Sequence, residues 1–311
     1  MPTPLLDNRQ LGPDTARLNL LTNGGFEIWQ RGNGPFTGSN ILGPDMWTVF
    51  PAGTDTLSVA RDTTNTDFAN GSNVAAQCNF VLGNGAGGTA FYQVARILPD
   101  SQGLRNRTVT FSVRVRTAQA NAINARVNCD GTGGVAVNSP AHPGDNTWRT
   151  LSVTTTVPVN ATFVSYVLVF TANCTAYVDN AMAVIGAQAA DYTPLHPAEE
   201  ISRCQRYYEI FEVASGNEIF TGTTYPSSGF ISGGWFPFKQ TKAVAPTATF
   251  QAPQWVVQSL VDGAQASSGP ATFVTSSGVM IRVSGSFGSN GQPYRLFPQG
   301  GAGFFYFEAN T

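Results

Sequence analysis

The side chains best suited to nucleophilic or acid–base chemistry are few in this sequence and form no recognised motif. The two histidines, His142 and His196, each precede a proline in an apparent loop, with no GxSxG or cysteine-nucleophile motif around them. We therefore expect structural roles for both. No CxxC spacing and no pairing with histidine is seen for the four cysteines, Cys78, Cys129, Cys174 and Cys204, which predicts buried free thiols.

Paired carboxylates offer another chemistry, because two of them flanking a glycosidic bond can hydrolyse it. Four aspartates, Asp45, Asp55, Asp62 and Asp67, lie close together in the sequence. Positions in turns explain these aspartates better than a catalytic site does. A glycan-cleaving fibre protein would place its carboxylate pair on a long parallel β-helix, and the hexapeptide-like repeats of that fold are absent. We expect a protein that is not an enzyme, and a glycan-cleaving activity is the alternative.

Composition excludes several classes of partner. Charged residues make up 12% of the 311 residues, about half the usual share, and the formal net charge is −2. The basic residues are scattered, which argues against binding to nucleic acid. The N-terminal residues show no signal-peptide pattern and no long apolar run follows, so we expect no membrane insertion.

The elements that would position any site are mainly β-strands. Over residues 108–117, Val109, Phe111, Val113 and Val115 alternate with polar residues, which is the period of a strand with one wet face. Residues 151–157 and 163–170 predict further strands, with Gly-, Asn- and Pro-rich turns between them. This pattern predicts a β-sandwich or jelly roll.

A helix is expected where this pattern is interrupted. Between Pro197 and Val213, residues Ile201, Cys204, Tyr208 and Phe211 recur at helical spacing. Short strands follow at residues 234–239, 248–251, 271–275, 279–287 and 304–308. The last strand has four consecutive aromatic residues, so its own domain or a neighbouring subunit should cover it.

Two distant motifs carry a family resemblance. The first is NLLTNGGFEIWQRG at residues 19–32, followed by GPDMW at 43–47; the alternation of Phe26 and Ile28 predicts a loop feeding a half-buried strand. The second is AYVDNAMAVIGAQAADYTPLHPAEEISRCQRYYEIF at residues 176–211. Together they resemble tailed-bacteriophage virion surface proteins such as tail fibres, spikes and head fibres. The resemblance covers residues 19–212, and only residues 235–250 match loosely beyond it.

In the family that the chain resembles, a carbohydrate-binding-module-like jelly roll, similar to galactose-binding folds, is followed by a helix and a small β domain. This implies the jelly roll at 19–190, a connecting helix at 191–213, and a C-terminal β domain at 214–311 that oligomerises. Residues 1–18 lie outside the resemblance; they contain three prolines and few apolar residues, and we expect them to form a flexible attachment arm if the chain belongs to a larger assembly. If the chain does not join an assembly, the arm is only a flexible terminus.

The resemblance also implies a function and a place. The chain would be a virion protein, assembled in the host cytoplasm and exposed on the particle surface, with other virion proteins and a host cell-surface glycan as partners. Two alternatives remain open. One is a capsid-decorating, head-fibre or tail-connector protein with a purely structural jelly roll, and the other is a glycan-degrading tailspike.

Sugar sites in such sandwiches combine an aromatic platform with amide or carboxylate hydrogen bonders, because a pyranose has an apolar face and a rim of hydroxyls. The candidates are Trp47, Tyr92 and Trp148, with Gln93 and Asn146 as hydrogen-bonding neighbours. Each aromatic residue also lies beside a predicted strand, where it would fill the core instead.

A structural calcium ion is implied by the same resemblance. Its ligands would be Glu27 and Asp179, with backbone carbonyls near Asn23 and Gly25. The alternative is that Glu27 stabilises a turn and that Asp179 belongs to an Asp-Asn turn.

Self-association is the last expectation. An apolar terminal strand, a helix carrying Tyr207, Tyr208 and Phe211, and a Gly/Ser/Pro-rich C-terminal domain are hard to stabilise in a monomer. Fibres and spikes of the resembling family are commonly trimeric. We expect a homotrimer held mainly by residues 197–311, with the jelly roll facing outward.

Overall fold

The computed structural model describes residues 18–84, 88–96, 103–224, 230–251, 254–261, 265–267, 270–284 and 293–309. The attachment arm expected at 1–18 lies outside this range except for Leu18. The chain divides into two compact units, Met1–His196 and Pro197–Thr311, and each is described by itself. No helix among the described residues is long and apolar enough to cross a membrane.

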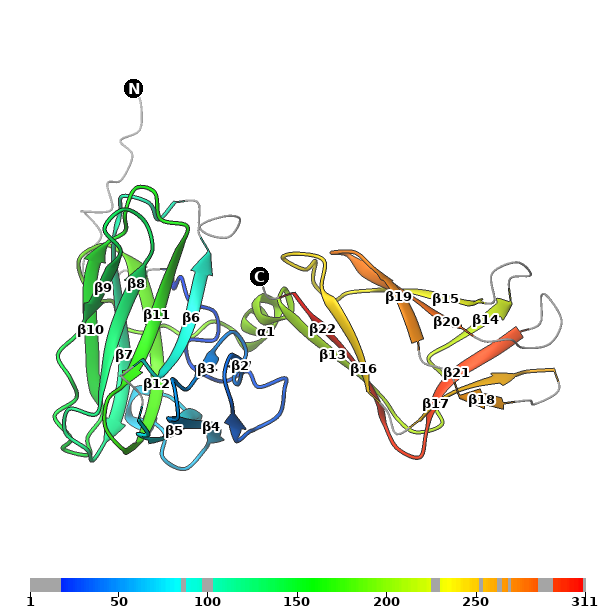
Figure 1. Ribbon diagram of the computed structural model, residues 1–311, viewed down its shortest axis with the longest axis horizontal. Coiled ribbons are helices and arrows are strands. Elements are labelled where there is room, and N and C mark those ends of the chain that lie inside the picture. The colour runs from blue at the N-terminus through cyan, green and yellow to red at the C-terminus, as the bar shows by residue number, and fades with distance from the viewer. Residues whose placement is uncertain are drawn as a thin grey trace, which may run out of the picture. The chain divides into compact units, whose positions relative to one another are not determined.

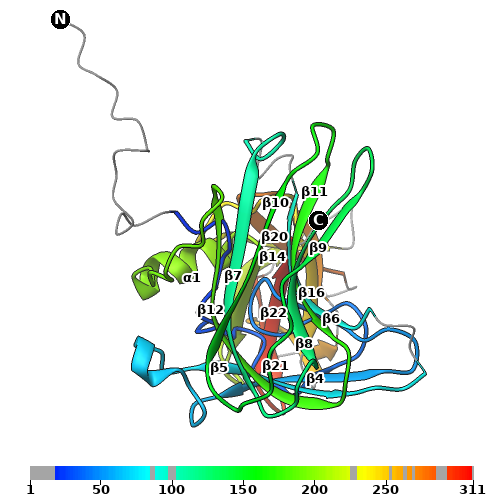
Figure 2. The same ribbon diagram turned by 90° about the vertical axis from the view of Figure 1, so that its left-hand side faces the viewer.

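The first unit is a jelly-roll β-sandwich of two six-stranded antiparallel sheets (Figure 1). One sheet has the order β1 (Phe36–Thr37), β4 (Thr56–Asp62), β5 (Ala75–Val81), β12 (Cys174–Ile185), β7 (Thr108–Thr117), β10 (Arg149–Thr156). The other has the order β2 (Ile41–Leu42), β3 (Thr48–Phe50), β6 (Ala90–Arg96), β11 (Phe163–Phe170), β8 (Ile123–Cys129), β9 (Val135–Asn138). Figure 2 shows β12 and β7 in one layer and β8 and β11 in the other.

The core lies between these two sheets. The inward residues of β7, Val109 to Val115 at every second position, are 0% exposed and belong to the same buried cluster as Val164, Tyr166 and Leu168 of β11. The expected strands at 108–117 and 163–170 are therefore confirmed. The other face of β7 is only partly wet, because Thr110 and Ser112 are buried as well.

The first motif forms a tight irregular segment instead of the expected strand. No strand is present over residues 20–32, and Phe26 has a φ of 53°. Side-chain hydrogen bonds replace the strand ladder here: Asn23 donates to the carbonyls of Ile28 and Asp45 and accepts from the Ile28 N–H. Such local side-chain hydrogen bonds to the backbone compete with regular secondary structure, which explains why the alternating sequence pattern wrongly predicted a strand here.

The second unit begins with α1 (Pro197–Gln205) and contains two sheets. A three-stranded sheet has the order β13 (Tyr208–Val213), β22 (Gly303–Glu308), β16 (Thr247–Gln251). A seven-stranded sheet has the order β18 (Gln265–Ser267), β17 (Gln254–Ser259), β21 (Pro293–Gln299), β14 (Phe220–Thr224), β15 (Phe230–Pro237), β20 (Gly278–Ser284), β19 (Pro270–Val274). The first unit also contains a single 3-10 helical turn, η1 (Phe68–Asn70).

The helix expected up to Val213 is confirmed in its first half and wrong in its second. It ends at Gln205, and Tyr208–Val213 pairs with β22 as β13. The sequence YEIFEV satisfies both helical spacing and strand alternation, and its aromatic and β-branched residues favour a strand that packs on a sheet. The last strand, β22, is central in its sheet, so its own domain covers it, with Phe305 and Phe307 buried.

The cysteines are free, as expected, and Cys78, Cys129 and Cys204 are buried whereas Cys174 is partly exposed. Burial raises the pKa of Cys129 and of Cys174 to about 11. These thiols therefore stay protonated near neutral pH, where a protonated thiol is a poor nucleophile and metal ligand.

A fully buried ion pair holds the first strand of the second unit. Lys242 Nζ lies 2.6 Å from Glu209 Oε2, and both side chains are 0% exposed. Lys242 also donates to the carbonyl of Gln205 at the end of α1. Burial lowers the pKa of Lys242, and the bond to Glu209 opposes this effect. The pair therefore links the end of the helix to the beginning of β13.

Replacing Lys242 with alanine should destabilise the second unit by about 3 to 5 kcal/mol, because Glu209 would keep a buried charge without a partner. Lys239→Ala is the matched control, since the Lys239 side chain is exposed and only its backbone N–H bonds Glu209. Urea denaturation followed by hydrogen exchange of peptides from residues 197–309 measures both. Equal losses in the two variants would contradict this role of the pair.

Candidate functional site

A groove of about 610 Å³ lies on the outward face of the second sheet of the first unit. Its walls come mainly from β6, β11 and β8, the three central strands. The lining residues are Gly88, Ala90, Tyr92, Val94, Arg105, Arg126, Asn128, Thr162, Phe163, Ser165 and Val167.

Strand register brings these side chains together from distant parts of the sequence. Tyr92 of β6 pairs with Val167 of β11, which pairs in turn with Arg126 of β8. The neighbouring row joins Val94, Ser165 and Asn128. Because side chains alternate along a strand, all of these residues point away from the core that their neighbours fill.

The floor of the groove is apolar and its rim is polar. Ala90, Val167 and Val169 form a small buried cluster against which Phe50 and Tyr92 pack. Asn128 and Thr162 provide amide and hydroxyl groups, and the buried Ser165 hydroxyl on β11 donates to the Asn128 carbonyl. An apolar floor with a few polar groups around it is the composition expected of a small-molecule site.

Tyr92 is the aromatic residue of this floor. Its hydroxyl donates to Asn40 Oδ1 at 3.4 Å, and the residue is half-buried. Burial raises the pKa of Tyr92, so its hydroxyl remains protonated and able to donate at neutral pH. One edge of the ring is thereby fixed while the ring lines the groove.

Two arginines reach the groove, and each is held through its Nε atom. Arg126 donates to Asn138 Oδ1 on β9 at 2.6 Å, and Arg105 donates to the carbonyl of Ala161 at 2.7 Å. These two arginines and Asn128 were not among the sequence candidates. The alternation of INARVNC in β8, which places Asn124, Arg126 and Asn128 on one face, is the signal that points to them.

The other sequence candidates take different places. Trp47 is 0% exposed, its ring lies 4.8 Å from Phe26 and 5.2 Å from Phe91, and its Nε1 donates to the Asn23 carbonyl. It therefore fills the core and cannot face a sugar. Gln93 is also buried, with its amide bonded to both the N–H and the carbonyl of Thr22.

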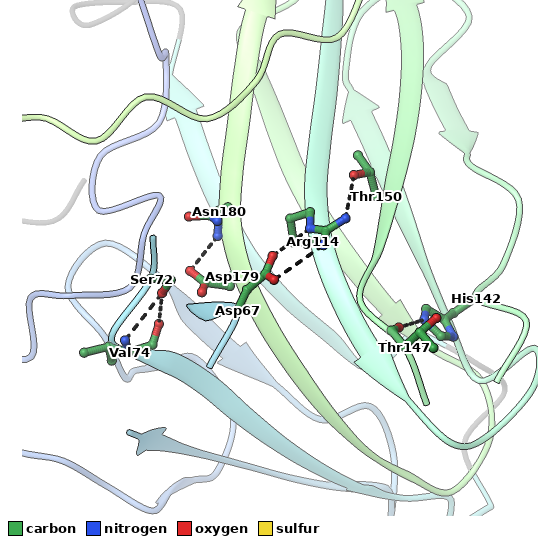
Figure 3. Close-up of polar contacts among 9 residues, drawn as sticks. All are labelled: Asp67, Ser72, Val74, Arg114, His142, Thr147, Thr150, Asp179 and Asn180. Atoms are coloured by element: carbon green, nitrogen blue, oxygen red, sulfur yellow. Dashed lines mark hydrogen bonds and ion pairs between the residues drawn. The ribbon is translucent and has the colours of Figure 1, made fainter. Parts of the chain in front are cut away.

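Asn146 and Trp148 lie outside the groove lining, in the turn that precedes β10. Asn146 is exposed with a φ of 55°, and Trp148 is partly exposed. His142 anchors the same turn. Its Nδ1 accepts from Gly144 N–H at 3.0 Å, so Nε2 donates to the Thr147 carbonyl at 3.1 Å, the contact drawn in Figure 3. The histidine is 0% exposed and has a structural role.

The four clustered aspartates stabilise local structure. Asp45 bonds Gln30 and Arg31, Asp55 accepts from Gly83 and Thr89, and Asp62 accepts from the backbone of Thr64 and Asn65. Asp67 pairs with Arg114 at 2.7 Å (Figure 3). Burial raises the pKa of Asp45 to about 6, and Arg31 opposes this rise.

The residues proposed for calcium do not fit one shared shell. The Asn23 carbonyl already accepts from Phe26 N–H and from Trp47 Nε1, and its side-chain oxygen accepts from Ile28. Glu27 is exposed, whereas Asp179 is 0% exposed. Among the described residues, no group of three or more His, Cys, Asp or Glu side chains is placed to hold a metal ion.

Asp179 is a buried acid in the first sheet, near Ser72 and the Asp67–Arg114 pair (Figure 3). Its Oδ1 accepts from Asn180 N–H, and its Oδ2 has no hydrogen-bond partner among the described residues. Burial raises the pKa of Asp179 to about 7, although the hydrogen bond from the Asn180 N–H opposes this effect.

Comparisons with known proteins found solved structures of low similarity to this chain. No protein-family model and no curated protein matches the sequence. The CBM22-1 xylan-binding domain from Paenibacillus barcinonensis Xyn10C is 15% identical, with a TM-score of 0.36, and the match covers 56% of this chain and 98% of that domain. The tandem CBM22-1–CBM22-2 domain of the same protein is 12% identical, with a TM-score of 0.37, over 94% and 97% of the two chains.

A bacteriophage structure is also similar. The enzymatically active domain of tailspike protein 4 of bacteriophage CBA120 is 17% identical, with a TM-score of 0.37. The match covers 54% of this chain and 21% of that chain, so this chain spans about a fifth of the tailspike structure's length.

Asp179→Asn should remove part of the pH dependence of unfolding of the first unit. Because the folded-state pKa is raised from 3.8 to about 7, protonated Asp179 favours folding below about pH 4, and this contribution is lost as the pH rises through 7. The variant should gain stability over wild type by a few kcal/mol between pH 4 and pH 8, since each tenfold change in proton affinity equals about 1.4 kcal/mol.

Urea denaturation of the full chain at several pH values measures this difference, with the exposed Asp191→Asn as the control. A D179N variant that is less stable than wild type at pH 8 would contradict the prediction. It would indicate an ionised Asp179 that a cation neutralises.

Proposed function

We propose that this chain is a non-enzymatic surface protein of a tailed-bacteriophage virion whose first unit binds a host-surface glycan. The observation that carries the binding role is the groove on β6, β11 and β8, with Tyr92 over an apolar floor and amide and hydroxyl groups on its rim. The virion role is supported by the two sequence motifs at 19–47 and 176–211.

The groove has the chemistry that a saccharide requires. A pyranose ring presents C–H groups on one face, which pack on Tyr92 and Val167, and hydroxyls at its rim, which Asn128 and Ser165 can bond. The groove lies on the outward face of a β-sheet, so an oligosaccharide of several sugars can lie along it. None of the described residues that line it is Asp or Glu, which supports binding without the carboxylate pair that hydrolysis uses.

Weak binding at one groove is sufficient if several copies are displayed on one particle. Linked sites raise the overall avidity by orders of magnitude, about 10² to 10⁴, without any new contact. An attached module with a shallow site is therefore a physically adequate receptor-binding device.

Tyr92→Ala should weaken adsorption of the purified protein to host cells by about tenfold or more, because the floor loses its largest apolar side chain. Phe68→Ala is the matched control, since Phe68 is 77% exposed on η1 and lies outside the groove. Fluorescently labelled protein bound to cells gives the readout. If wild type does not adsorb at all, the receptor-binding proposal fails and the jelly roll is a structural spacer in a head fibre or tail connector.

We also propose that the chain forms a homotrimer through residues 197–311. In the three-stranded sheet, Phe305 and Phe307 face the core, whereas Phe304 and Tyr306 remain partly exposed on the opposite face. These partly exposed rings, with Ile210 beside Tyr306 in register, provide apolar area that copies of the chain can bury.

Multi-angle light scattering at micromolar concentration should give three times the chain mass for the full chain and the monomer mass for a truncation that ends at Gln188. The truncation keeps the sandwich core, which lies wholly within residues 21–183. A monomeric full chain, or a trimeric truncation, would contradict the proposal.

A further inference from the structure

Within the described part of the chain, the groove lining contains two cationic side chains, Arg105 and Arg126, and no acidic one. We infer that its ligand is an acidic glycan, a saccharide whose sugars bear carboxylate or phosphate groups. The inference rests on the proposed glycan-binding function and adds the charge of the ligand.

Arg126 lines the groove from β8, and a neighbouring side chain orients its guanidinium. Its Nε donates to Asn138 Oδ1, the residue opposite it on β9. No other hydrogen bond or ion pair of the Arg126 side chain is formed within the described part of the chain, so its terminal nitrogens can donate to a ligand. The residue is half-buried and lines the groove.

Arg105 is arranged in the same way near the beginning of β11. Its Nε donates to the Ala161 carbonyl, and its terminal nitrogens make no bond within the residues that the structure describes. Arg126 is in register with Val167, whereas Arg105 bonds the carbonyl of Ala161, which precedes β11. The two cations therefore lie at different points along the groove and suit acidic groups on different sugars of one chain.

Among the described residues, no acidic side chain lines the groove to neutralise these charges, in a chain whose formal net charge is −2. The carboxylate of Asp130, near the rim, accepts hydrogen bonds from the N–H groups of Thr162 and Phe163 and from the Thr162 hydroxyl. Those bonds hold the rim in place and leave the arginines for a ligand.

Guanidinium groups suit this ligand for geometric reasons. A planar guanidinium donates two parallel hydrogen bonds to a carboxylate or a phosphate, and such charge-assisted bonds are roughly twice as strong as neutral ones. Tyr92, two strands from Arg126 and so about 10 Å away, supplies the surface for the apolar face of a sugar. Stacking and ion pairing therefore act on one bound chain.

Calorimetric titration of the full chain with two matched pairs of oligosaccharides tests the inference. One pair is oligogalacturonate and its methyl ester, and the other is phosphomannan oligosaccharide and its dephosphorylated form. We expect at least one acidic member to bind about tenfold or more tightly than its neutral partner, with an affinity that falls as salt rises. The pair that shows the difference identifies carboxylate or phosphate as the acidic group.

Substitutions then locate the effect. Arg126→Gln and Arg105→Gln should each weaken binding of the acidic member about tenfold. Arg107→Gln is the matched control, because it removes the same charge from an exposed arginine outside the groove lining and should leave binding unchanged. Thermal melts of the three variants exclude loss of fold.

The outcomes separate this inference from the proposed function. Equal binding of acidic and neutral members, unaffected by R105Q and R126Q, would overturn the acidic ligand while glycan binding stands. Equal losses of binding in R126Q and R107Q would show that only the net charge of the protein matters. This result would also overturn the inference of an acidic ligand. Absence of binding to all four oligosaccharides, together with absence of adsorption to cells, would overturn both.

Discussion

Strand alternation couples the core of the first unit to its groove. Every second side chain of β6, β11 and β8 must face the opposite sheet, so the residues between them are necessarily presented outward. Phe91, Val127 and Leu168 fill the core, while Tyr92, Arg126 and Val167 stand beside them on the other face. A shift of one residue in any of these strands would expose core residues and bury an arginine, so the register of the groove is protected by the hydrophobic core.

The sequence predicted the strands best where one face is fully apolar. Residues 108–117 and 163–170 were predicted with the bounds that the structure shows. The first has apolar residues at every second position, and the second is a short, nearly continuous apolar run bounded by turn residues. Residues 208–213 failed because their pattern fits a helix and a strand equally, and only pairing with β22 decides. Residues 20–32 failed because Asn23 satisfies the backbone locally, which periodicity cannot reveal.

The site was harder to predict than the fold because it depends on strand order. Tyr92 was found as an aromatic residue beside a strand, but so was Trp47, and only the structure distinguishes the outward ring from the buried one. Arg126 and Asn128 could have been recognised as one face of β8. Their proximity to Tyr92 could not be predicted from the sequence. β11, the strand that lies between β6 and β8 in the sheet, follows β8 by more than thirty residues.

The separation of inward and outward positions has an evolutionary consequence. Substitution at Arg126, Asn128 or Tyr92 changes the chemistry of the outer face while the packing between the sheets is preserved, since the buried cluster contains none of these three residues. Such positions tolerate change at little cost in folding stability. A sandwich of this kind can therefore acquire new ligand preferences through single substitutions, and variation among relatives should concentrate on alternate residues of β6, β8 and β11.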